Sequence, residues 1–161
     1  MALALSGVMR SSMLFFAALL AACAASDTDE PKACTTIGCV DGYSLDFEAS
    51  SWAQGKYTVE LTIDGKPCTC EATLPLDASS KSTCTLPEVQ FGLSGSALPA
   101  GEQGLVGLVF TSQPAKIDVT VKRDGATLGQ PASFTPAYKT SQPNGPECGP
   151  TCTNASDTLK L

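Results

Sequence analysis

The chain has 161 residues, and 16 acidic against 10 basic side chains give it a formal net charge of −6 at pH 7. This acidic balance argues against binding to nucleic acid, which requires a basic surface. The chain contains no histidine, which excludes a Ser-His-Asp triad, a Cys-His pair and every metal site with an imidazole ligand. Nothing nominates a set of carboxylates or thiolates for catalysis, so we expect no enzyme and no cofactor.

The first 22 residues have the composition of an export signal. A single charge, Arg10, precedes a run of small and apolar residues at positions 12–22. The run is shorter than the ~20 apolar residues that a membrane-spanning helix needs, and a polar segment follows it. This order predicts a signal peptide over residues 1–22.

The apolar run ends in Leu20-Ala21-Ala22-Cys23, which resembles the lipobox of bacterial lipoproteins. The resemblance implies cleavage before Cys23 and acylation of that residue, with chains such as palmitate, which anchor the protein to a membrane of the cell envelope. Two or more acyl chains make such an anchor stable. Ala24 stands where an aspartate favours the inner membrane, so we expect the outer membrane, on its periplasmic or surface face. An ordinary signal-peptidase cut, releasing a secreted protein, is the alternative.

Residues 24–33 are polar and acidic and include one proline. This composition predicts a flexible tether between the lipidated Cys23 and the rest of the chain. A tether of that length reaches at most about 35 Å. The expected organisation is therefore a signal peptide at 1–22, a lipidated cysteine and tether at 23–33, and one domain at 34–161.

From residue 34 onward, hydrophobic side chains recur with a period of two, as in strands that bury one face. The expected extended segments are residues 43–48, 57–63, 68–74, 84–93 with a break at Pro87, 105–110, 117–121, 128 with 134–138, and 158–161. Asp64-Gly65 and Asp124-Gly125 predict hairpin turns. Residues 105–110 are apolar without alternation, which predicts a strand buried on both faces. Seven or eight short strands separated by turns indicate an all-β sandwich.

The stretch Gly55-Lys56-Tyr57-Thr58-Val59-Glu60-Leu61, followed by Asp64-Gly65, resembles a pattern common in immunoglobulin-like and fibronectin-like modules. The resemblance implies an Ig-like or fibronectin-like β-sandwich. Trp52 departs from the antibody pattern, because it precedes its strand instead of lying within one. The plain interpretation of Trp52 is a residue of the core or its edge. Its position on a loop also makes it the candidate for contact with a partner.

Of the eight cysteines, seven remain in the body of the chain if Cys23 carries lipid. In an exported protein most of them should be oxidised. Two pairs flank the domain, Cys34 with Cys39 and Cys148 with Cys152, and we expect disulfides that join the two ends to each other or to neighbouring strands. A four-thiolate zinc site and a thioredoxin-like redox motif are the alternatives, but the spacings depart from those of both.

Cys68 and Cys70 lie on one face of an expected strand, so a bond between them would be strained. A Cys70–Cys84 bridge would close a short loop and leave Cys68 as the unpaired thiol. The plain interpretation of Cys68 is a buried, inert cysteine. A copper ligand or an intermolecular disulfide is the alternative.

Two cysteine-rich stretches, CTTIGC at residues 34–39 and PNGPECGPTC at residues 143–152, resemble those of cysteine-rich lipoproteins of the myxobacterial kind. The resemblance implies a lipid-anchored β-sandwich and no particular activity. We therefore expect a non-enzymatic binding or structural module displayed on a membrane, in contact with an envelope protein or glycan. A thiol-based copper-binding, zinc-binding or redox lipoprotein is the alternative.

Overall fold

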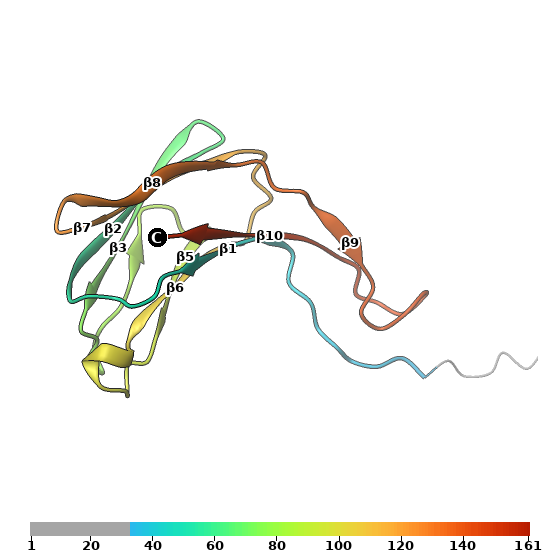
Figure 1. Cartoon of the computed structure of the whole chain (residues 1–161). Helices are drawn as coiled ribbons and strands as arrows, with labels where there is room; N and C mark the ends of the chain where they lie inside the picture. Colours follow the sequence, from blue (N-terminus) through green and yellow to red (C-terminus); the bar gives the residue numbers. More distant parts are fainter. Residues whose placement is uncertain (1–32) are drawn as a thin grey trace, which may run out of the picture. The chain divides into compact units, whose positions relative to one another are not determined.

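The computed structural model describes residues 33–161, which form two five-stranded β-sheets packed face to face (Figure 1). All the strands belong to one compact unit, Thr35–Leu161. Within the described part of the chain, no helix is both long and apolar enough to span a membrane. The predicted signal peptide, the lipidation site Cys23 and the tether up to residue 32 lie outside the described residues.

Sheet A has the strand order β5-β6-β1-β10-β9, and sheet B has the order β4-β3-β2-β7-β8. The strands of sheet A are β1 (Gly42–Glu48), β5 (Val89–Ser94), β6 (Gly104–Phe110), β9 (Lys139–Ser141) and β10 (Cys152–Lys160). The strands of sheet B are β2 (Gly55–Ile63), β3 (Lys66–Leu74), β4 (Thr83–Cys84), β7 (Ile117–Arg123) and β8 (Ala126–Phe134). A single 3₁₀ turn, η1 (Ala100–Glu102), lies between β5 and β6.

The predicted disulfide-stapled β-sandwich is confirmed, and both Asp-Gly pairs form hairpin turns. The described chain has ten strands instead of seven or eight, because β4 and β9 are only two and three residues long. The segment predicted at 84–93 divides at Pro87 into β4 of sheet B and β5 of sheet A. Pro87 therefore lies where the chain crosses between the sheets, since a proline cannot donate to a strand ladder.

The first and last strands lie side by side at the centre of sheet A. They run parallel, with Gly42 opposite Asn154 and Glu48 opposite Lys160. The other strand pairs of the described chain are antiparallel. In constant-type immunoglobulin domains the first strand instead lies at the edge of a sheet. Here β1 pairs with β10 along the whole length of β1, so the start and the finish of the domain share one set of hydrogen bonds.

The core consists of the inward-facing side chains of both sheets, as the alternation predicted. Leu45 and Val59 are completely buried, for example. The prediction that residues 105–110 are buried on both faces is wrong, because Val106 is 48% exposed and Val109 39% exposed. A register shift between β5 and β6 at Gly92 breaks the alternation of this strand. The bulge allows consecutive apolar residues in a strand that still has one outward face.

Candidate functional site

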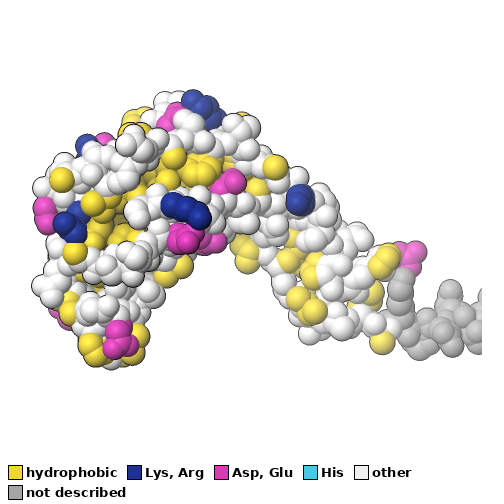
Figure 2. Space-filling model, in the orientation of Figure 1, with side chains coloured by type: hydrophobic (Ala, Val, Ile, Leu, Met, Phe, Trp, Pro, Cys, Tyr) yellow, Lys and Arg dark blue, Asp and Glu magenta, His cyan; other side chains and the backbone are white. Residues whose placement is uncertain are grey.

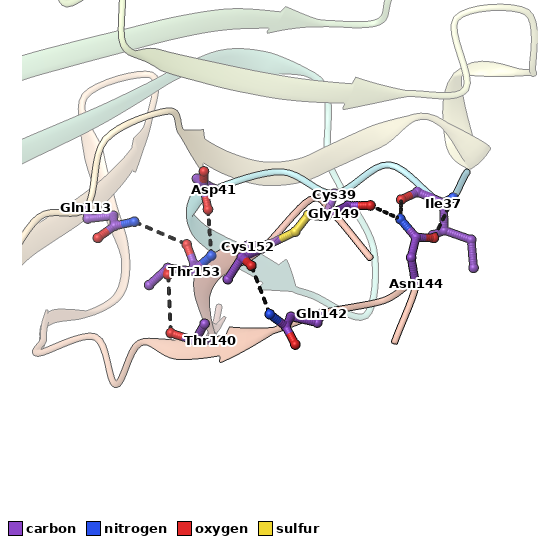
Figure 3. Close-up of a disulfide and its surroundings, with 11 residues drawn as sticks. Ile37, Cys39, Asp41, Gln113, Thr140, Gln142, Asn144, Gly149, Cys152 and Thr153 are labelled. Carbon is purple, nitrogen blue, oxygen red and sulfur yellow. Dashed lines mark hydrogen bonds between the residues drawn. A yellow bond between two sulfur atoms is a disulfide. The ribbon is translucent and has the colours of Figure 1, made fainter. Parts of the chain in front are cut away.

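One end of the sandwich is cross-linked where the chain enters the domain. We call this the entry end: residues 35–41 before β1 and residues 142–153 around the start of β10. A disulfide joins Cys39 to Cys152 across 113 residues of sequence, with their Cα atoms 6.0 Å apart (Figure 3). Cys34 and Cys148 are also disulfide-bonded. The expectation that outer cysteines join the two ends of the domain is therefore confirmed for Cys39 and Cys152.

The side chain of Asn144 adds four hydrogen bonds to this cross-link, and the Asp41 carboxylate accepts another from the backbone N–H of Thr153 (Figure 3). Its Oδ1 atom accepts from Thr35 Oγ1 at 2.7 Å and from the backbone N–H of Ile37 at 2.9 Å. Its Nδ2 atom donates to the carbonyl oxygens of Ile37 at 2.9 Å and Gly149 at 2.6 Å. An amide side chain offers both donors and acceptors, so Asn144 holds two distant segments together. These contacts hold the two segments of the entry end in a fixed arrangement.

The inner cysteines are arranged as expected. Cys70 and Cys84 face each other on β3 and β4 and form a disulfide, with their Cα atoms 4.0 Å apart. Cys68 is the free cysteine of residues 33–161, and it is only 2% exposed. No group of three Cys, Asp or Glu side chains that could hold a metal comes together among these residues. Cys68 is therefore a residue of the core.

The opposite end of β1 and β10 contains a small cavity. We call this the far end, and its cavity has a volume of about 190 Å³. The cavity is lined by Ala49, Ser50, Ser51, Trp52, Ala53, Tyr57, Arg123, Leu128, Gly129 and Leu161. Typical small-molecule pockets start at about 300 Å³. The far-end cavity therefore suits one side chain or one terminal group of a larger partner.

Trp52 forms a fixed wall of this cavity. Its indole meets the Tyr57 ring edge-on, with centroids 5.6 Å apart. Its Cδ1 edge lies so close to Gly104 that a Cβ atom there would be only 2.5 Å away. The Tyr57 hydroxyl donates to the carbonyl oxygen of Ala53 at 2.6 Å, which holds the loop that carries Trp52. The residue predicted for partner contact is thus partly buried and held in one position.

Arg123 supplies the positive charge of the cavity. It occupies the inward-facing position at the end of β7, in register with Tyr57, and the preceding inward residues, Val119 and Val121, are buried. None of the salt bridges within residues 33–161 involves Arg123. Sequence reasoning missed this residue. The available signal was the alternation Ile117, Val119, Val121, Arg123, in which a cation stands at the next core-facing position.

The outer face of sheet B is also hollowed beside Glu60 and Asp118, but these two charges are already paired. Lys122 Nζ lies 2.6 Å from Glu60 Oε1, and Lys116 Nζ lies 3.1 Å from Asp118 Oδ1. The hydrogen bond from Ser133 lowers the pKa of Asp118, and Lys116 lowers it further. Exposed pairs of this kind satisfy one another and are typical of a solvated sheet face. They do not single out a binding site.

Fold and site together define a disulfide-stapled β-sandwich with an aromatic, positively charged cavity at one end. In comparisons with protein-family models, curated proteins and solved structures, nothing matches this chain.

Proposed function

We propose that this protein is a non-enzymatic binding module of the bacterial cell envelope. It is anchored through acyl chains on Cys23, with the outer membrane as the expected location, and it binds an envelope protein or glycan at the far-end cavity. The lipobox-like Leu20-Ala21-Ala22-Cys23 supports the anchor. The observation that carries the binding role is the unpaired guanidinium of Arg123 beside the fixed indole of Trp52.

The chemistry of the cavity favours an acidic group with an apolar or ring-shaped body. A guanidinium presents a planar fork of donors that matches a carboxylate in two parallel hydrogen bonds. The rings of Trp52 and Tyr57 offer rigid apolar surface beside this fork. Arg123 has no carboxylate partner among residues 33–161, so a bound acid would complete the site.

The position of the cavity supports the same proposal. The chain enters the sandwich beside the Cys39–Cys152 disulfide, and β1 then runs its seven residues toward the far end. A strand of that length spans about 23 Å at about 3.3 Å per residue. A module held by its N-terminal tether would carry its binding cavity at the end of β1 away from the point of entry.

The binding proposal is tested with matched acidic and neutral probes. Isotope-labelled protein is titrated with N-acetyl-leucine and glucuronate, each against its neutral counterpart, N-acetyl-leucinamide and glucose. We expect only the acids to shift the Trp52 indole N–H resonance, and we expect Arg123→Gln to remove the response. Equal responses to acid and neutral probes would contradict the proposal. A response confined to N-acetyl-leucine favours a polypeptide partner, and one confined to glucuronate favours a glycan.

The anchor is tested separately by mass spectrometry of protein purified from bacterial membranes. We expect a chain that begins at Cys23 and carries acyl chains. The Cys23→Ser variant should retain its leader or be released without lipid. An unacylated wild-type chain would contradict the anchoring proposal and leave the binding proposal untouched.

The alternative, a thiol-based copper, zinc or redox lipoprotein, needs several reduced thiols. Six of the described cysteines form disulfides, and Cys68 is buried, so no observation favours this alternative. Thiol titration of the folded, exported protein distinguishes the two. One free thiol or none fits the binding module, whereas several thiols with stoichiometric copper or zinc would fit the alternative.

A further inference from the structure

The last strand, β10, is paired on both sides only at its beginning. β1 flanks it from Asn154 to Lys160, whereas β9 reaches only Cys152, Thr153 and Asn154. Residues 155–160 therefore have a second edge without a hydrogen-bonded strand in the described chain, and we call this the open edge. No loop of residues 33–161 donates a backbone hydrogen bond to it. Unpaired backbone groups of this kind are a template for another strand.

Apolar side chains lie between the open edge and β8, the edge strand of sheet B. Figure 2 shows hydrophobic side chains at the surface in this region. The residues are only partly buried, and they are Leu128, Ala132, Phe134, Tyr138, Ala155 and Leu161. β8 approaches β10 at Gly129, where an added Cβ atom would lie 3.5 Å from the carbonyl oxygen of Lys160. A strand on the open edge would cover apolar groups that the sandwich leaves accessible.

The open edge carries one inward-facing charge, Asp157. Its Oδ2 atom accepts a hydrogen bond from the hydroxyl of the buried Tyr43 at 3.0 Å. None of the salt bridges within residues 33–161 involves Asp157. An inward charge on an edge strand disfavours pairing with a strand that brings no counter-charge. Asp157 therefore selects for a basic partner.

We propose that an extended polypeptide segment of a partner protein docks along residues 155–160 as an additional strand of sheet A, with a Lys or Arg side chain paired with Asp157. Main-chain hydrogen bonds supply affinity in this mode of recognition, and alternate side chains supply specificity. The apolar side chains of the segment lie against the partly buried residues beside β8. This surface shares Leu128 and Leu161 with the lining of the far-end cavity but includes neither Arg123 nor Trp52. The inference therefore does not rest on the proposed function.

The other edge of the sandwich on this side is protected. β8 contains Pro131 and a register shift opposite Val119 and Val121, and both features discourage strand addition. Residues 155–160 contain neither proline nor glycine, and the pairing of β10 with β1 continues through them without a shift. The one obstacle on β10 is the inward charge of Asp157, which a strand carrying a counter-charge would neutralise.

The test uses a blocked seven-residue peptide in which Val, Lys and Val alternate with Thr, and a matched peptide with Glu in place of Lys. Amide hydrogen exchange of the full exported chain locates the binding, and fluorescence anisotropy measures the affinity. We expect the Lys peptide to slow exchange within residues 155–160 and to bind about tenfold more tightly than the Glu peptide. Asp157→Asn should reduce this preference to about twofold or less. Glu48→Gln, an outward carboxylate on the neighbouring strand, should preserve it.

Three results would overturn the inference. The first is no protection of residues 155–160 at millimolar Lys peptide, and the second is equal affinity for the two peptides in the wild-type chain. The third is protection without peptide that rises with protein concentration, because a second copy of this chain would then occupy the edge. Arg123→Gln, the cavity variant, should bind the Lys peptide normally, so the failure of one proposal is distinguishable from the failure of the other.

Discussion

The entry end and the far end of this sandwich are built on opposite principles. At the entry end, a disulfide and the amide of Asn144 join segments that lie more than a hundred residues apart in sequence. At the far end, aromatic packing of Trp52 and Tyr57 surrounds a cavity whose only cation, Arg123, has no ion pair in the described chain. Cross-linking secures the end at which the chain enters, and the other end leaves a cation without an ion pair among the described residues.

The largest expected effect is loss of the entry-end cross-link. Cys34 and Cys148 are also disulfide-bonded, so all four entry-end cysteines are replaced by Ala together. We expect this to lower the free energy of unfolding by about 5 kcal/mol, because the entry-end cross-link closes a loop of more than a hundred residues in the unfolded chain. The matched control, Cys70→Ala with Cys84→Ala, opens a loop of 14 residues and should cost about 3 kcal/mol. Urea unfolding followed by Trp52 fluorescence gives both values. A larger loss in the control would contradict this ranking.

Crowding at the far end should have the next largest effect. Gly104→Ala places a methyl group against the Trp52 indole, and we expect it to cost about 2 kcal/mol. Gly101→Ala is the control, since its added Cβ atom would meet no atom within 4 Å, and it should change stability little. In a Trp52→Leu background the cost of Gly104→Ala should shrink. An unchanged cost would show that the indole is not the obstacle.

Removal of the far-end cation should leave stability nearly unchanged. Arg123→Gln breaks no ion pair within residues 33–161, so we expect a change in the free energy of unfolding of less than about 0.5 kcal/mol. The same variant should lose its response to N-acetyl-leucine or glucuronate. A large loss of stability, measured by urea unfolding, would instead make Arg123 a structural residue and remove the contrast between the two ends.

The smallest expected effect concerns pH and lies on the outer face of sheet B. Ser133 and Lys116 lower the pKa of Asp118, so this carboxylate stabilises the fold above its unfolded pKa of about 3.9. That contribution is lost as pH falls through the lower, folded pKa. Ser133→Ala should therefore make the free energy of unfolding fall less steeply between about pH 4 and pH 2. Acid titration by circular dichroism checks this, and coincident curves for both proteins would contradict it.

The sequence predicts the parts of this fold that depend on neighbouring residues. The alternation of apolar side chains locates β1, β2, β3 and β7, and local loop closure identifies the Cys70–Cys84 pair. The local sequence cannot locate the bulge that exposes Val106 and Val109, because that bulge arises from the register between two strands. It also cannot show that β9 stops short and leaves part of β10 unpaired.

In the candidate site, too, the sequence predicts features set by neighbouring residues and misses those set by contacts between distant segments. Trp52 stood out because an aromatic residue on a loop is a recognisable local signal. Arg123 did not, although its position in the alternating pattern of β7 is visible once the strand is known. The contacts of Asn144 join residues 107 positions apart, and nothing in the local sequence predicts them. Contacts between distant segments are therefore what the structure adds.

The Cys39–Cys152 disulfide also determines what happens when a protease cuts this domain. Nine of the ten described strands, β1 to β9, lie between the two cysteines and therefore inside one covalent ring. A single cut anywhere within that ring leaves both fragments joined through sulfur. A nicked domain would keep its mass, apart from the water added at the cut, until a reductant separates the pieces. The entry-end disulfide thus makes the domain tolerant of isolated backbone breaks.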